Sequence, residues 1–226
     1  MRTLILLLIF IFCLNAWSQS PASNELDEFI EIINQTQLEN DVVYDLGGVL
    51  MADSCSTFMN RTEVLGPIGQ SIYHLLTTSR PSFSRLMDGG QIRQFCPAYP
   101  KMKDEQKAII WVLLMTTVAH FESTCNANAT AAGPNGTAAG YFQLHKGKEP
   151  FYDQKAGYCQ LNCSTDPKLS SRCALGLIEI QLGRAQGLIF SNRSYWDVLR
   201  PNGRARKADD IQRALRKFSM CNQPAA

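Results

Sequence analysis

Histidine is scarce in this sequence, and charged residues are slightly fewer than usual. The 226 residues include three histidines. Because His74, His120 and His145 are scattered along the chain, we expect no metal site, and we predict no other cofactor. Charged residues make up 19% and hydrophobic residues 45%, a balance that fits a globular core and excludes wholesale disorder. No internal repeat is visible.

The start of the chain lacks an apolar run long enough to cross a bilayer. The run from Leu4 to Leu14 has 11 residues, whereas a spanning helix needs about 20. It follows Arg2 and precedes a small-x-small triplet at residues 16–18, which is typical of a cleaved secretory signal. We therefore predict that residues 1–18 are a signal peptide. The mature protein is expected to be exported, periplasmic or secreted, and to keep no transmembrane segment.

Cysteine, in contrast, is plentiful, with eight residues in the chain. Cys13 leaves with the predicted signal, so seven remain in an oxidising compartment, where cysteines usually form disulfides. We predict three disulfides and one unpaired thiol. Cys159, Cys163 and Cys173 have a spacing that could hold a metal, but no histidine lies near them. We therefore expect at least one of these three cysteines to take part in a disulfide.

Charge is divided unevenly along the chain. Residues 19–99 hold 4 Lys/Arg and 10 Asp/Glu, whereas residues 100–226 hold 17 and 10. The two parts could pack together through complementary charge, or the basic part could bind a polyanion. The segment from Cys96 to Pro100 looks like a joint. We predict an N-terminal helical extension over residues 19–100 and a main domain over residues 101–226.

Apolar residues recur at helical spacing along most of the chain, which predicts a mostly α-helical protein. The predicted helices span residues 24–37, 67–79, 81–87, 104–122, 171–186 and 206–219. The helix over 104–122 is apolar nearly all round, so we expect it to be buried. Asn135-Gly136 predicts a minor β-hairpin, and residues 41–63 look like a loop or a short helix.

Glu122 ends the buried helix and opens a segment without acids. It continues the apolar line of Trp111, Met115 and Val118, so it should lie at the edge of the core. Burial and the negative end of the helix dipole both disfavour its ionised form and should raise its pKa. From Ser123 to Lys148, 26 residues contain no Asp or Glu. Glu122 could be a solvated helix-end residue, but an isolated carboxyl with a pKa of about 6–7 suits a general acid.

Two stretches, Glu122-Ser123 and Ala138–Leu144 (AAGYFQL), resemble the motif of soluble lytic transglycosylases and goose-type lysozymes. The family pattern is Glu-Ser, a loop, and then Gly-Ala-x-Gly-apolar-x-Gln-Ile/Leu. Its first glycine is Thr137 here, and the likeness extends loosely over residues 105–200. It implies a lysozyme-like α-helical domain with a glycan cleft, and it implies that Glu122 is the catalytic acid/base.

The same resemblance implies substrate-binding positions along the cleft. These candidates are Ser123, Gly140, Tyr141, Gln143 and Tyr195. The glycine would let a sugar approach the backbone closely, and the glutamine amide would bind the substrate or hold the loop. The tyrosine of "Ser-Tyr-Trp-Asp" could serve as the cleft tyrosine, or could equally pack in the core beside its neighbouring tryptophan.

The later part of the chain departs from the family, because it lacks the Tyr-Asn-Ala-Gly segment. This suggests a divergent, bacterial member with altered cleft walls. Two of six Asn-x-Ser/Thr sequons fall in the acid-free segment, where glycans would block a site, which also favours a bacterial host.

We expect a peptidoglycan lytic transglycosylase or lysozyme that cleaves the β-1,4 bond between MurNAc and GlcNAc. Peptidoglycan glycan strands are the expected partner, and nucleic acid is not. A non-catalytic glycan- or protein-binding module on the same fold is the alternative. A small disulfide-rich interaction module would suit the cysteines but not the long buried helix.

The outcome of the reaction depends on a second carboxylate. Goose-type lysozymes place water-positioning acids in the segment that is acid-free here. The resemblance therefore favours assistance by the substrate's own N-acetyl group and a 1,6-anhydro product. Glu149, Asp153 and Asp166 are the nearest later acids that could supply a second carboxylate and allow hydrolysis.

Overall fold

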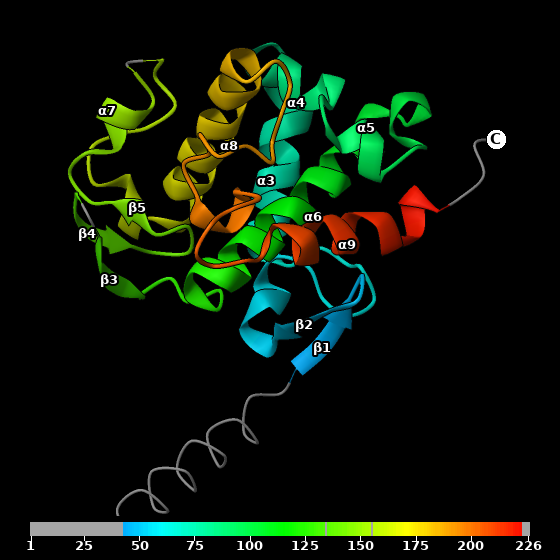
Figure 1. Cartoon of the computed structure of the whole chain (residues 1–226), viewed down its shortest axis with the longest axis horizontal. Helices are drawn as coiled ribbons and strands as arrows, with labels where there is room; N and C mark the ends of the chain where they lie inside the picture. Colours follow the sequence, from blue (N-terminus) through cyan, green and yellow to red (C-terminus); the bar gives the residue numbers. More distant parts are fainter. Residues whose placement is uncertain (1–42, 134, 155, 223–226) are drawn as a thin grey trace, which may run out of the picture. The chain divides into compact units, whose positions relative to one another are not determined.

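The computed structural model describes residues 43–133, 135–154 and 156–222. The predicted signal peptide and the helix predicted over residues 24–37 lie outside this part. Residues from 43 onward form one compact unit, shown in Figure 1. None of the helices described is long and apolar enough to span a membrane.

The described residues are mostly α-helical with a minor β component, as predicted. The helices are α3 (Pro67–Thr78), α4 (Ser84–Asp88), α5 (Ile92–Phe95), α6 (Asp104–Ser123), α7 (Glu149–Tyr152), α8 (Pro167–Arg184) and α9 (Ala208–Lys217). The strands are β1 (Val43–Leu46), β2 (Val49–Ala52), β3 (Thr130–Gly133), β4 (Gly136–Ala139) and β5 (Leu144–His145). The predicted helices over residues 67–79, 104–122 and 206–219 thus match α3, α6 and α9 closely.

Helix α6 passes through the centre of the unit (Figure 1), packed against α3, α4, α9 and β2. It is buried on all sides from Ile110 to Ala119. The hydroxyl groups of Thr116 and Thr117 lie within this buried length, and each donates to a carbonyl of the preceding turn at 2.7 Å. No polar side chain of this length is therefore left unpaired, and each large apolar residue contributes about 1.5–3 kcal/mol by its burial.

The predicted boundary at residue 100 does not coincide with a division between compact units. Helix α3 packs against α6 and α8, and α4 packs against α8, so elements from both sides of that residue share one core. Among the described residues, two ion pairs cross residue 100, Arg80–Asp104 at 3.1 Å and Arg85–Glu179 at 3.2 Å. In both pairs the arginine comes from the part before residue 100 and the carboxylate from the part after it. The charge counts had suggested the reverse, an acidic N-terminal part packed against a basic C-terminal part.

A β-hairpin forms where the sequence suggested a loop or short helix. Strand β1 pairs with β2 in antiparallel register, with Leu46 opposite Val49. Gly47 and Gly48 form the turn at φ values of +62° and +79°, which side chains with a Cβ rarely adopt. Exposed and buried residues alternate along β1. This alternation beside a Gly-Gly pair was the strand signal that the helical interpretation overlooked.

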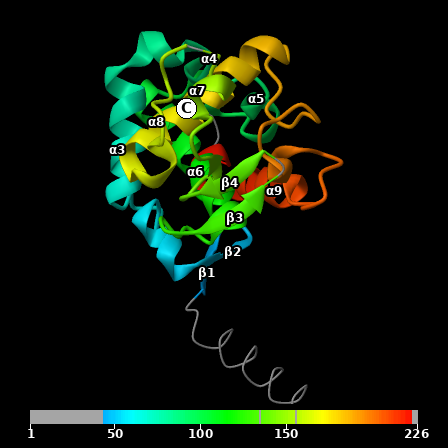
Figure 2. The ribbon, with the colours of Figure 1, turned by 90° about the vertical axis from the view of Figure 1, so that its left-hand side faces the viewer.

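The predicted hairpin around Asn135-Gly136 is present and belongs to a three-stranded antiparallel sheet. Strand β3 pairs with β4, with Gly133 opposite Gly136, and β4 pairs with β5 through Ala139 and Leu144. Figure 2 looks onto this sheet. The sheet thus occupies the acid-free segment that follows Glu122.

Helix α8 begins at Pro167, four residues before the predicted start. The Asp166 carboxylate caps it, accepting from the backbone N–H groups of Lys168 at 2.9 Å and Leu169 at 2.8 Å. Aspartate at the N-cap and proline in the first turn are the standard start of a helix. The local signal was present, and the prediction was wrong because it counted only apolar periodicity.

Three disulfides form, as predicted. They join Cys55 to Cys125, Cys96 to Cys221 and Cys159 to Cys173. The seventh cysteine, Cys163, is unpaired and buried. Burial and the nearby Glu149 raise the pKa of its thiol to about 12. Because the thiolate is the reactive form, this thiol should be inert while the protein is folded.

We expect the mature protein to show no reactive thiol when native and one per chain after denaturation without reductant. Titration with an aromatic disulfide reagent measures both states, and Cys163→Ala should give none in either. Seven thiols in the denatured protein would contradict the disulfides. A thiol that reacts rapidly in the native state would contradict the burial of Cys163.

Candidate functional site

A cleft of about 1080 Å³ opens between the β3–β5 sheet, α7, α8 and the segment 193–204. Glu122 lies at its edge, in the last turn of α6. The helix ends there because Thr124 takes a left-handed conformation with φ of +53°. Beyond that turn the Cys55–Cys125 disulfide ties the chain back to the core. The sequence-predicted carboxyl is therefore held at a fixed point where core and cleft meet.

The carboxyl of Glu122 is largely withdrawn from solvent, and its pKa is raised as the sequence predicted. Burial is the main cause and Asp197 adds to it, while Arg200 acts in the opposite direction; together they raise the pKa from 4.5 to about 7. A carboxylic acid with this pKa keeps a large protonated fraction at neutral pH. It can give a proton and take one back, as general acid/base catalysis requires.

Asp197 is a second cleft carboxylate, which the sequence analysis missed. Its Oδ2 accepts from the backbone N–H of Ala205 at 2.8 Å, and its Oδ1 lies 3.6 Å from Nη1 of Arg200. Arg200 in turn donates through Nε to the Ser194 carbonyl at 2.9 Å. The segment is thus bound to itself, and Asp197 lines the same cleft as Glu122. No local motif marks it, because it follows Glu122 by 75 residues.

The three acids proposed from the sequence as second carboxylates have other roles. Glu149 is buried and accepts from the backbone N–H groups of Asn162 at 3.2 Å and Ser164 at 3.3 Å. Asp153 is fully buried and accepts from the Cys159 N–H at 2.8 Å. The third, Asp166, caps α8. Each is bound to backbone and none lines the cleft.

Tyr195 lines the cleft, while the adjacent Trp196 has its ring in the core. The Trp196 indole N–H donates to the Phe142 carbonyl at 2.8 Å. The Tyr195 hydroxyl accepts from the backbone N–H of His145 at 3.0 Å and lies 2.8 Å from Nδ1 of the same histidine. Burial raises the pKa of Tyr195, and the charge of Glu122 contributes in the same direction. Tyrosine and glutamate are therefore electrostatic neighbours in one cleft.

The tautomer of His145 decides where the Tyr195 hydroxyl points. Nε2 of His145 is buried and has no hydrogen-bond partner among the described residues. A buried N–H without a partner costs more than a buried lone pair, so we assign the hydrogen to Nδ1. Nδ1 then donates to Tyr195, whose oxygen accepts two bonds. This leaves the Tyr195 O–H free to donate into the cleft.

Ser123, Gly140 and Tyr141, predicted as substrate contacts, support the cleft rather than line it. The Ser123 hydroxyl donates to the Tyr141 carbonyl at 2.8 Å, which joins the end of α6 to the turn after β4. The Tyr141 ring is buried edge-on against Phe58, with 5.0 Å between centroids. A Cβ on Gly140 would meet the Ser164 carbonyl oxygen at 1.9 Å. Close approach of protein backbone, and not of a sugar, explains this glycine.

Gln143 both lines the cleft and holds its wall. Its side-chain NH₂ donates to the carbonyls of Gly140 at 2.9 Å and Ala129 at 3.1 Å. These bonds fasten the loop between β4 and β5 to the segment before β3. Of the two roles considered from the sequence, holding the loop is therefore the one that its amide hydrogens perform.

The two walls of the cleft differ in chemistry. The sheet side contributes small neutral residues, namely Ala131, Gly133, Asn135 and Ala138. The other side contributes apolar Leu177 and Ile180 from α8 and four arginines. The aromatic rings of Phe151 and Tyr152 come from α7, where Tyr152 packs on His145 of β5 with 5.4 Å between ring centroids. The acid-free segment of the sequence thus forms one whole wall of the cleft. This accounts for the isolation of Glu122 on that side.

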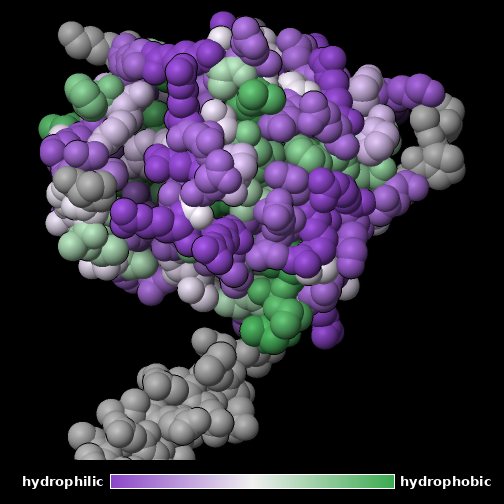
Figure 3. All heavy atoms as spheres, in the orientation of Figure 1, coloured by the Kyte–Doolittle hydropathy of each residue, from purple (hydrophilic) through white to green (hydrophobic). Residues whose placement is uncertain are grey.

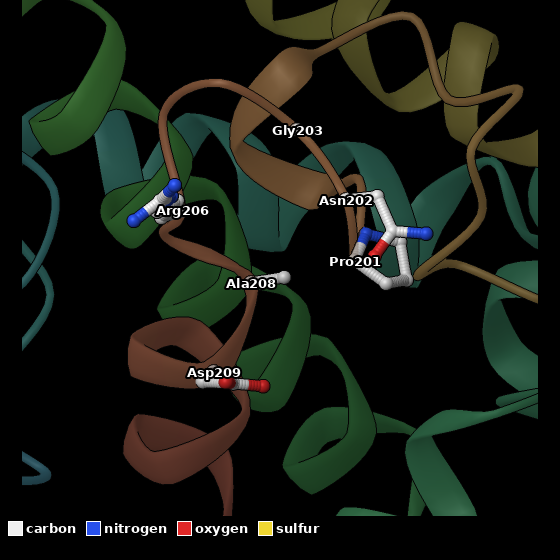
Figure 4. A pocket seen from close by; sticks show the side chains of 6 residues that line it. All are labelled: Pro201, Asn202, Gly203, Arg206, Ala208 and Asp209. Carbon is white, nitrogen blue, oxygen red and sulfur yellow. The ribbon is translucent and has the colours of Figure 1, made fainter.

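A smaller hollow of about 370 Å³ lies at the start of α9 (Figure 4). It is lined by Pro201, Asn202, Gly203, Arg206, Ala208 and Asp209. It does not include Glu122, Asp197 or Tyr195. The candidate site is therefore the larger cleft. It holds Glu122 together with Asp197, whose charge raises the pKa of Glu122, and Tyr195, whose pKa Glu122 raises in turn.

The likeness of this chain to known proteins lies in its fold. No family model matches the sequence, and no curated protein matches it. A solved wild-type structure of DslA (Bd0314), a Bdellovibrio protein, is similar with a TM-score of 0.56 and 20% identity, over 69% of this chain and 91% of that one. Two glutamate-to-glutamine variants of DslA match with the same TM-score and coverage, at 18% and 20% identity. The likeness shows a shared fold.

The raised pKa of Glu122 predicts a pH dependence of stability. The folded protein keeps this proton between the ordinary pKa of 4.5 and about 7, whereas the unfolded chain releases it. The stability of the wild type should therefore fall as pH rises through this window, by about 3 kcal/mol between pH 4 and pH 8 from this group.

Urea unfolding of the wild type and Glu122→Gln at both pH values tests this expectation. Glu122→Gln should lack that loss and should be the more stable protein at pH 8. Glu105→Gln, at an exposed position in the first turn of α6, is the matched control and should follow the wild type. Parallel pH profiles for the wild type and Glu122→Gln would contradict the raised pKa.

Proposed function

We propose that the protein is an exported glycosidase that cleaves the β-1,4 bond between MurNAc and GlcNAc in peptidoglycan. The observation that carries the proposal is Glu122, a carboxylic acid with a pKa of about 7 at the edge of an open cleft. Glycosidases of this chemistry need one carboxyl protonated near neutral pH, so that it can protonate the leaving oxygen.

Three further observations support the proposal. The family motif runs through Glu122-Ser123 and Ala138–Leu144, both of which are built into the cleft. The mostly α fold with its small sheet fits a divergent lysozyme-like domain of the soluble lytic transglycosylase type. Three disulfides fit an oxidising compartment outside the cytosol, where peptidoglycan lies.

In the proposed reaction, Glu122 gives its proton to the bridging oxygen as the bond from that oxygen to the anomeric carbon breaks. Positive charge develops on the sugar ring at that carbon. Asp197, held by Ala205 and Arg200, stabilises this charge and orients a water molecule. The water attacks the anomeric carbon, and its proton passes to Glu122, which restores the acid.

Asp197 changes the expected product. The sequence favoured a 1,6-anhydro end because it offered no carboxylate near Glu122. With Asp197 in the cleft, one acid is kept protonated by burial while a second is held by an arginine and a backbone N–H. Such a pair of unlike environments is typical of a proton donor that works beside a carboxylate which stabilises the developing positive charge. We therefore propose hydrolysis, with a new reducing end.

Tyr195 is proposed to position the reacting groups. With its oxygen held by His145, its O–H can donate to the Glu122 carboxylate or to a sugar in the cleft. Either bond would align the acid with the glycosidic oxygen. The exposed ring of Phe151 and the adjoining Tyr152 offer apolar faces on which sugar rings can pack.

Glu122→Gln should lose nearly all lytic activity, by at least about a hundredfold, because the amide cannot deliver a proton. Release of soluble fragments from purified peptidoglycan measures it, with circular dichroism as the control for folding. Glu105→Gln should keep the wild-type rate. Turnover of a tenth of wild type or more in Glu122→Gln would refute its assignment as the acid.

Asp197→Asn should slow cleavage and shift the product from a reducing end towards a 1,6-anhydro end, because the bound water loses its carboxylate partner. Mass spectrometry separates the products, since the anhydro form is lighter by one water. Asp209→Asn, on the exposed start of α9, is the control and should leave the product unchanged. Anhydro ends released by the wild type would refute hydrolysis.

A further inference from the structure

Three arginines of the cleft have no partner among the residues that the structure describes. Arg184 ends α8, and Arg193 and Arg204 lie in the segment that carries Asp197. All three are exposed. Within the described part of the chain, no carboxylate lies within ion-pair distance of any of them, and their guanidinium groups make no hydrogen bond to protein. The fourth cleft arginine, Arg200, differs because it is bound to Asp197 and to the backbone.

The cleft therefore carries surplus positive charge on one side. Its only acids among the described lining residues are Glu122 and Asp197. Burial keeps much of Glu122 protonated, and the Asp197 carboxylate faces Arg200. The opposite wall comes from the acid-free segment and offers no counter-charge. Three guanidinium groups thus remain for a ligand on the α8 side.

A simpler explanation accounts for only one of the three. An arginine in the last turn of a helix interacts favourably with the helix dipole, which would explain Arg184 by itself. Arg193 and Arg204 lie outside α8 and α9, so the dipole does not explain them. Figure 3 shows that the face over α9 and the loops before it is mainly hydrophilic. Convergence on one cleft from separate segments points instead to a shared anionic ligand.

We propose that Arg184, Arg193 and Arg204 form a carboxylate-recognition wall, by which the cleft selects glycan strands that carry free carboxylates over neutral ones. The inference rests on the proposed glycosidase function and adds its specificity. The planar guanidinium group binds a carboxylate through two parallel hydrogen bonds, which makes arginine the suitable residue type. The small, neutral sheet wall leaves room for the sugar backbone on the other side.

The carboxylate can come from two sources in peptidoglycan. In strands stripped of peptide, each MurNAc carries a free lactyl carboxylate. In strands with stem peptides, the lactyl group is an amide and the free carboxylates lie on the peptide. Both present acids at repeated intervals along one strand, whereas chitohexaose has a similar β-1,4 backbone and no acid.

Binding to the Glu122→Gln protein tests the inference without cleavage. Fluorescence anisotropy would measure the affinity for labelled peptide-free strands, strands with stems, chitohexaose and oligothymidylate. We expect one or both carboxylated strands to bind at least about tenfold more tightly than chitohexaose, with the tighter arm identifying the source. A triple variant in the same background should bind carboxylated strands no more tightly than chitohexaose; its changes are Arg184→Ala, Arg193→Ala and Arg204→Ala. Each single change should weaken the affinity for carboxylated strands by up to about tenfold.

Arg172→Ala is the matched control, because Arg172 is exposed on the same helix and does not line the cleft. It should leave every affinity unchanged. In the active protein, the triple change should raise KM for carboxylated strands with little effect on kcat, since these groups bind away from the broken bond. A merely structural role would lower affinity for chitohexaose as well.

Equal affinity for neutral and carboxylated strands would overturn the proposal, as would a preference that survives the triple change. Oligothymidylate binding as tight as the strands would also overturn it, by showing general attraction for polyanions. Failure of the proposed function is distinguishable. If the wild type cleaves no strand yet the arginine-dependent preference is present, the recognition wall stands and the glycosidase assignment falls.

Discussion

The burial of α6 is the constraint on which the rest of the structure depends. A helix that is apolar on every side can be stable only when other elements surround it, and α3, α4, α9 and β2 do so. Where this cover ends, the helix must end too, and Glu122 is the side chain at that point. The raised pKa of Glu122 is therefore a direct consequence of where the core stops, because burial is its largest cause.

The residues that carry the family resemblance act mainly as supports. Ser123 ties the helix end to the Tyr141 carbonyl, Gly140 allows contact with the Ser164 carbonyl, and Gln143 fastens the loop. Each keeps the sheet wall at a set distance from the end of α6. A motif of this kind specifies the shape around an acid more than the contacts to a substrate.

The two walls of the cleft carry different kinds of side chain. The sheet wall is small and neutral, so it leaves the burial of Glu122 undisturbed by other acids. The opposite wall carries the second carboxylate, the tyrosine and the arginines, and its own hydrogen bonds hold it in place. Arg200 is important there, because it binds Asp197 and two backbone carbonyls of the same segment. Glu122 at the end of α6 and Asp197 in the segment 193–204 thus reach one cleft from separate parts of the chain.

The sequence by itself determined the features that depend on neighbouring residues. Helical periodicity predicted α3, α6 and α9, turn residues predicted the β3–β4 hairpin, and an apolar line predicted the environment of Glu122. The number of disulfides followed from the cysteine count, but their pairing did not. Only the tertiary structure brought Asp197 to Glu122, placed Tyr195 on His145 and gathered the arginines on one wall. These contacts join segments far apart in the chain, and no local pattern encodes them, because each depends on how the loops return across a shared core.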